Sequence, residues 1–86
     1  MKLHGAVIRE QGITFAVVVV KPHAMSSDST ARETMVNMQS FFPGMPIALA
    51  SQDSRGRFRY HGRNDLVNFL ASIDPSRIPW KEYTFS

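Results

Sequence analysis

The stretch from residue 13 to residue 20 is the most continuously apolar part of the chain, and most of its side chains are β-branched. Such residues favour strands, and a run without polar alternation indicates a strand that is covered on both faces. The stretch therefore predicts the central strand of a sheet, around which the rest of the chain has to pack.

The segment before this run predicts a partner for the central strand. Residues 3–9 alternate weakly, and Gln11-Gly12 then has the composition of a two-residue hairpin loop. That loop places Ile8 opposite Phe15 and Ala6 opposite Val17.

A helix is predicted after the central strand, which ends at Pro22 because proline has no amide hydrogen. The polar residues 26–30 supply capping oxygens, and Thr30 with Glu33 fits a capping box. The helix runs to about residue 41 and ends at Pro43-Gly44. Its apolar stripe comprises Ala31, Met35, Met38 and Phe42.

The second half of the chain predicts a hairpin, a helix and a tail. Strands at 46–52 and 57–61 flank a four-residue turn at 53–56, which places Leu49 opposite Tyr60 and Ser51 opposite Phe58 on the core face. Asn64 is the expected N-cap of the following helix. The stripe of that helix is Leu66, Phe69, Leu70 and Ile73, and Asp74-Pro75 ends it. The tail at 78–85 is either an edge strand or a segment packed across the core.

These elements predict an α+β two-layer sandwich of order ββαββα with a possible C-terminal strand. We expect a mixed sheet of four to five strands with two helices on one face, in a single domain spanning residues 1–86. From residue 13 onward the outline resembles a ferredoxin-like split βαβ unit or, without the last strand, a minimal thioredoxin-like core. At the position of the thioredoxin cysteine pair this chain has Pro22-His23-Ala24-Met25, so redox chemistry is not expected.

Composition limits the classes of function. Ten Lys and Arg against seven Asp and Glu give a formal net charge of +3, which mildly favours anionic partners. The absence of cysteine excludes disulfides and thiolate catalysis and is typical of a cytoplasmic protein. The apolar run is too short to span a membrane and follows a turn rather than a signal-peptide start, so no membrane contact is expected.

A run of basic residues at alternate positions is the clearest candidate for a binding surface. On a strand, alternate side chains share a face at a spacing of about 7 Å, which suits a row of phosphates. The alternative is a solvated face, or an edge kept charged against aggregation. The candidate residues for nucleic-acid or anion binding are Arg55, Arg57, Arg59, His61 and Arg63.

The strand-to-helix junction at 21–32 is a candidate site for an anion or a small ligand. Helix N-termini attract anions, but the junction has no glycine-rich phosphate cradle, and helix capping explains its serines. Its candidate ligand residues are Lys21, His23, Ser26 and Arg32. Histidine spacing indicates no metal site, and the carboxylates fit turns and caps. The sequence therefore predicts neither an enzyme nor a bound cofactor or metal.

Exposed aromatic residues are candidates for a protein interface. Phe41 is adjacent to Phe42, so both rings cannot follow the same helical stripe. The tail adds Trp80, Tyr83 and Phe85, more aromatic surface than one edge strand needs. The first functional hypothesis is therefore a module for protein–protein interaction or self-association, and self-association would give a homodimer. Nucleic-acid binding through Arg57, Arg59 and His61 is the second, and ligand binding at the junction is the third.

Overall fold

The computed structural model describes residues 1–10 and 12–85, and these residues form five strands, two α-helices and two short 3₁₀ helices. The strands are β1 (Lys2–Glu10), β2 (Ile13–Val19), β3 (Ile47–Gln52), β4 (Phe58–His61) and β5 (Lys81–Thr84). The α-helices are α1 (Asp28–Gln39) and α2 (Asn64–Ser72), and the 3₁₀ helices are η1 (Pro22–Met25) and η2 (Pro75–Arg77).

The sheet has the order β4-β3-β2-β1-β5, with β2 in the middle. β1 and β2 are antiparallel, with Ile8 opposite Phe15 and Ala6 opposite Val17 as predicted. β3 lies parallel to β2 on its other side, and residues 15–18 are buried. The prediction of a central strand is therefore confirmed. Of the predicted hairpin loop, Gln11 lies outside the described residues and Gly12 has a φ of 77°.

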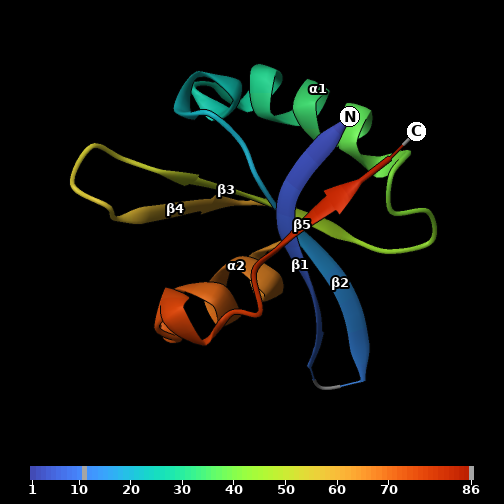
Figure 1. Cartoon of the computed structure of the whole chain (residues 1–86). Coiled ribbons are helices and arrows are strands. Elements are labelled where there is room, and N and C mark those ends of the chain that lie inside the picture. The colour runs from blue at the N-terminus through green and yellow to red at the C-terminus, as the bar shows by residue number, and fades with distance from the viewer. Residues whose placement is uncertain (11, 86) are drawn as a thin grey trace.

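Each face of the sheet carries one helix, as Figure 1 shows with α1 and α2 on opposite sides. Along β3, Ile47 and Leu49 pack in the core beneath α1, whereas Ala48 and Ala50 pack in the core beneath α2. The α+β class and the mixed sheet with two helices are confirmed, but the prediction that both helices lie on one face is wrong. The physical reason is that β2 and β3 are apolar on both faces, so both faces need cover.

The strand order also differs from both outlines that the element order resembles. A ferredoxin-like split βαβ unit has a strand between its two parallel strands, but here Ala16 of β2 pairs directly with Ile47 of β3. The thioredoxin-like outline omits the last strand, whereas β5 pairs antiparallel with β1, with Leu3 opposite Tyr83. The C-terminal segment is therefore an edge strand, one of the two alternatives that the sequence left open.

The N-terminus of α1 is capped by a different residue from the one predicted. The Ser27 side chain accepts a hydrogen bond from the Thr30 N–H at 3.2 Å, which makes Ser27 the N-cap. Thr30 lies inside the helix, so the capping box of Thr30 and Glu33 is wrong. The expected stripe is found: Ala31 and Phe42 are buried, and Met35 and Met38 pack against them.

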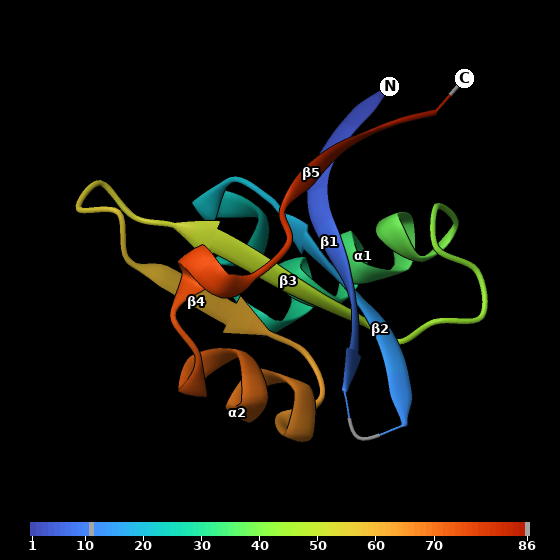
Figure 2. The ribbon, with the colours of Figure 1, turned by 60° about the horizontal axis from the view of Figure 1, so that its bottom comes forward.

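The second helix and the tail follow the predicted order. The N-cap of α2 is Arg63 rather than Asn64, which is the first helical residue. Leu66 and Leu70 are buried beneath α2, with Phe69 and Ile73 packed beside them as predicted. Figure 2 shows the start of β1 next to the end of β5, where the backbone N–H of Phe85 donates to the Met1 carbonyl at 2.8 Å.

Candidate functional site: the β4 edge

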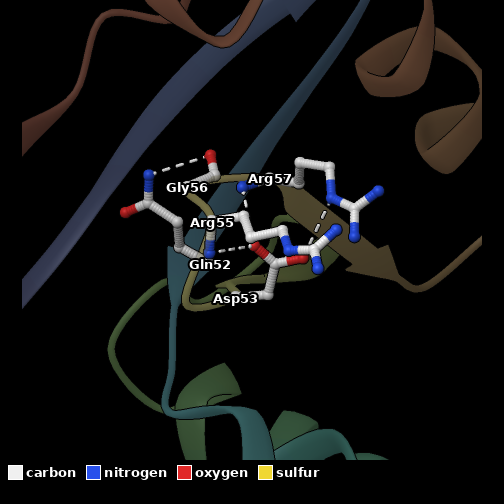
Figure 3. A network of polar contacts seen from close by, with 5 residues as sticks. All are labelled: Gln52, Asp53, Arg55, Gly56 and Arg57. Carbon is white, nitrogen blue, oxygen red and sulfur yellow. Dashed lines mark hydrogen bonds and ion pairs between the residues drawn. The ribbon is translucent and has the colours of Figure 1, made fainter.

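The turn between β3 and β4 is fixed by the Asp53 carboxylate (Figure 3). Its Oδ1 accepts the backbone N–H groups of Arg55 and Arg57 at 2.9 Å each, and its Oδ2 accepts the Arg57 Nε–H at 3.2 Å. The hydrogen bond from the Arg57 backbone is the main cause that lowers the pKa of Asp53, because it stabilises the carboxylate. Gln52 Nε2 donates to the Gly56 carbonyl at 3.0 Å. The hairpin tip is thus held by its own polar groups.

The turn contains three residues rather than four, and this changes the register of β4. Gly56 has a φ of 82°, and its N–H donates to the Asp53 carbonyl, as in a type I turn closed by a glycine bulge. Tyr60 therefore lies opposite Ala50, and Arg59 lies opposite Ser51. The predicted pairs of Leu49 with Tyr60 and Ser51 with Phe58 are wrong by one residue.

Alternation along β4 places its aromatic and basic side chains on opposite faces of the sheet, and the shifted register turns the aromatic side chains to the α2 side. Phe58 and Tyr60 pack against the core beneath α2. Arg59 and His61 share the other face, because successive strand residues point in opposite directions. Arg59 lies opposite the buried Ser51 on the α1 side.

The five basic residues of the predicted ribbon do not form one free row. Arg57 pairs with Asp53 at 3.2 Å, and Arg63 pairs with Asp65 at 2.6 Å. The hydrogen bond from Arg63 is the main cause that lowers the pKa of Asp65. Among the described residues Arg59 forms no ion pair and is exposed. The cation with the greatest freedom to meet a partner on β4 is therefore Arg59.

A groove of about 400 Å³ lies between the β3–β4 hairpin and the C-terminal end of α2. The Phe58 and Tyr60 rings are stacked with centroids 6.1 Å apart, and the Trp80 ring also stacks on Phe58 with centroids 5.4 Å apart. A volume of this size is in the range of ligand and side-chain pockets. The groove is lined by Gly56, Arg57, Phe58, Tyr60, Leu70, Ala71, Ile73 and Pro75.

The Tyr60 hydroxyl is buried beside this groove without a hydrogen-bond partner in the described part of the chain. Burial raises the pKa of Tyr60, because the phenolate loses its hydration. Buried hydroxyl groups nearly always form a hydrogen bond, so the hydrogen-bonding capacity of this hydroxyl is left unsatisfied.

The ladder between β3 and β4 determines which backbone groups face the open edge of the sheet. The Asp53 N–H donates to the Arg57 carbonyl at 2.9 Å, so these two residues form a hydrogen-bonded pair. Bonded and non-bonded pairs alternate along an antiparallel ladder. The backbone of Arg59 therefore bonds to β3, whereas the N–H and C=O groups of Phe58 and Tyr60 point outward. β4 is a terminal strand of the sheet, so these groups face its free edge.

The serine hydroxyls at the predicted junction site serve mainly to cap helices. Ser27 caps α1, and the Ser26 hydroxyl donates to the His23 carbonyl at 2.9 Å. Lys21, His23 and Arg32 are exposed. The described part of the chain contains no group of three or more His, Cys, Asp or Glu side chains that could hold a metal ion. Likewise, none of its helices is long and apolar enough to cross a membrane.

The aromatic residues predicted as an interface pack largely on the protein itself. Phe41 lies 4.8 Å from Phe85, and Tyr83 lies 5.4 Å from Phe42, between ring centroids. Trp80 stacks on Phe58, and its Nε1–H donates to the Pro75 carbonyl at 2.9 Å. These rings therefore help to hold the tail against both faces of the sheet.

No local sequence pattern indicates the groove, because Leu70 and Ala71 of α2, Ile73 after it and Pro75 of η2 reach β4 only through the tertiary fold. The turn did carry a signal: a glycine after an Asp-Ser-Arg segment is compatible with the three-residue loop that sets the register. No protein-family model matches this sequence, and comparisons with curated proteins and with solved structures find no match.

Proposed function

We propose that this protein is a non-catalytic interaction domain that binds an extended segment of a partner protein by strand addition at β4. In strand addition, backbone hydrogen bonds supply affinity, and pockets for alternate side chains supply specificity. One observation carries this proposal: Phe58 and Tyr60 direct backbone groups to the free edge while their side chains line the adjacent groove. A partner strand would thus meet hydrogen-bonding groups and an apolar groove at the same two residues.

The second edge of the sheet is less suited to this role. β5 carries charges of both signs, and Lys2 pairs with Glu82 at 3.7 Å across the strands that form this edge. The Lys81 ammonium lies 4.8 Å from the centre of the Tyr83 ring. Such charged, self-paired residues protect an edge against pairing with another chain.

Nucleic-acid binding is the competing hypothesis, and the site offers it less support. Arg57 and Arg63 are already paired with carboxylates. The rings of Phe58 and Tyr60 pack against the core beneath α2, so they are poorly placed to act as stacking platforms for single-stranded bases.

Selection of seven-residue peptides from a random display library tests the proposal. Selected peptides would be titrated into the ¹⁵N-labelled protein, and we expect the largest amide shift changes at residues 58–61 and 70–75. The same protein would be titrated with a DNA duplex and a single strand at two salt concentrations. Failure to select peptides that bind at β4, or salt-dependent DNA binding that shifts the arginine signals, contradicts the proposal.

A pair of matched variants makes the mapping specific. Ala71 is an exposed helical residue that lines the groove, so Ala71→Arg fills part of the groove without disturbing the core. Asn68→Arg places the same side chain elsewhere on α2, at another exposed position. We expect Ala71→Arg to weaken the selected peptides at least about 10-fold, which corresponds to about 1.4 kcal/mol, and Asn68→Arg to leave them unchanged.

A further inference from the structure

The positive charge of the protein is concentrated around β4. Residues 53–65 contain four arginines and two aspartates, and so account for two of the three net positive charges of the whole chain. Both aspartates already pair with an arginine of the same segment, Asp53 with Arg57 and Asp65 with Arg63. Two arginines remain: Arg55 lies in the turn before β4, and Arg59 is exposed in the middle of β4, on the face opposite the groove. A strand added here would therefore place one side chain directly beside a guanidinium that forms no ion pair with residues 1–10 or 12–85.

A second copy of this chain is a poor occupant of this edge. Two-fold antiparallel pairing through the outward backbone groups has three registers: Phe58 with Phe58, Phe58 with Tyr60, or Tyr60 with Tyr60. These registers place Arg59 opposite Arg57, Arg59 and His61, respectively. Like charges directly opposite each other destabilise a pair of strands. Two of the three registers place Arg59 opposite an arginine, and the third places it opposite His61, which supplies no negative charge. No register gives Arg59 an acidic partner, so self-pairing through β4 is disfavoured.

We infer that the partner of β4 is a segment of a different protein in which one acidic residue stands between two apolar residues. This inference rests on the proposed function and specifies the partner. The acidic side chain lies opposite Arg59, and the two apolar side chains lie opposite Phe58 and Tyr60 and enter the groove side of the sheet. The alternation of the partner thus matches the alternation of β4, because side chains of paired strands share a face.

Three synthetic peptides test this inference directly. Their sequence is Ser-Thr-Phe-X-Phe-Thr-Ser with blocked ends, and X is Glu, Gln or Lys. We expect the Glu peptide to bind about 1.5- to 5-fold more tightly than the Gln peptide at low salt, and the Lys peptide to bind most weakly. The difference should shrink as salt is raised, because exposed charges are screened.

Charge reversal at β4 provides the matched test. With Arg59→Glu we expect the order to invert, so that the Lys peptide binds most tightly. Arg9→Glu makes the same change of charge at an exposed position on β1 and should leave the order unchanged. Circular dichroism and amide spectra of both variants verify that they fold.

The outcomes separate this inference from the proposed function. Equal affinity of the three peptides, with shift changes at residues 58–61, overturns the acidic partner and leaves strand addition standing. Failure of all three peptides, together with failure of the library selection, contradicts strand addition itself. Sedimentation of the protein alone should show no association through β4; a dimer that the Glu peptide dissociates would overturn the exclusion of a second copy.

Discussion

Replacing Tyr60 by phenylalanine tests the packing beside the groove. The change removes a hydroxyl that is buried and unpaired among the described residues, and it keeps the ring that stacks on Phe58. A buried polar group without a partner costs about 1–3 kcal/mol. Because the deleted oxygen also leaves a small void, we expect Tyr60→Phe to raise the free energy of unfolding by about 1 kcal/mol. For a domain of this size, that corresponds to a rise in Tm of about 4–8 °C.

Thermal and urea denaturation, followed by circular dichroism, measure this effect. Tyr83→Phe is the control, since the Tyr83 hydroxyl is not among the buried unpaired atoms, and its free energy of unfolding should change by less than about 0.5 kcal/mol. An unchanged urea m-value would show that the unfolded state is the same. A Tyr60→Phe variant that is less stable than Tyr83→Phe would refute the reasoning, because the hydroxyl would then have a stabilising partner.

The pH dependence of the same variant gives a second readout. Burial raises the pKa of Tyr60 in the folded protein above its value of about 10 in the unfolded chain. The contribution of the neutral phenol to the free energy of unfolding is therefore fully present below about pH 10, and it is lost as the pH rises through the folded pKa. The stability gain of Tyr60→Phe over the wild type should accordingly increase above about pH 10.

Three further changes test other parts of the fold. Gly5→Ala should destabilise the protein by about 1–3 kcal/mol in urea denaturation, because its Cβ would lie 2.4 Å from the Val17 carbonyl oxygen; an unchanged midpoint would contradict the close approach of β1 and β2. Ser27→Ala should lower the free energy of unfolding by about 1 kcal/mol, because α1 loses its N-cap. An equal loss of stability in Ser29→Ala would show that Ser27 is not the specific cap. The pKa of Asp53 is lowered in the folded state, so its contribution to stability is present above about pH 4 and is lost as the pH falls through the folded pKa. Asp53→Asn should therefore be less stable than the wild type at neutral pH. In urea denaturation this difference in stability should narrow below about pH 4. Equal stability of the two proteins at neutral pH would show that the Asp53 carboxylate makes no stabilising contact.

Local patterns in the sequence were sufficient to predict the elements and the first hairpin. The apolar run at β2 and the two-residue connection before it determine the pairing of Ile8 with Phe15. Helical spacing likewise identifies the buried residues of α2. These features depend on residues that are close in sequence, where hydrophobic periodicity and turn chemistry act directly.

The features that were misplaced or missed have two causes: how distant elements meet, and the conformation of one turn residue. The two helices cover opposite faces because both sides of β2 and β3 have to be buried. The continuous apolar runs of these strands indicate this need, but the order of the elements along the chain does not. The register of β4 depends on one backbone conformation, the positive φ of Gly56, which changes a four-residue turn into a three-residue loop. A shift of one residue moves every side chain of a strand to the other face. The groove beside Tyr60 forms only when α2 and η2 pack against β4, so no local pattern reports it.

Amide hydrogen exchange at β4 tests the central proposal most directly. In the free protein the outward N–H groups of Phe58 and Tyr60 should exchange quickly, whereas the Arg59 N–H, which bonds to β3, should exchange slowly. Saturation with the Glu peptide should slow exchange at Phe58 and Tyr60 by at least about 10-fold and leave Arg59 little changed, because new backbone hydrogen bonds protect only the outward groups. Unchanged exchange at Phe58 and Tyr60 in the peptide-saturated protein would contradict strand addition at β4.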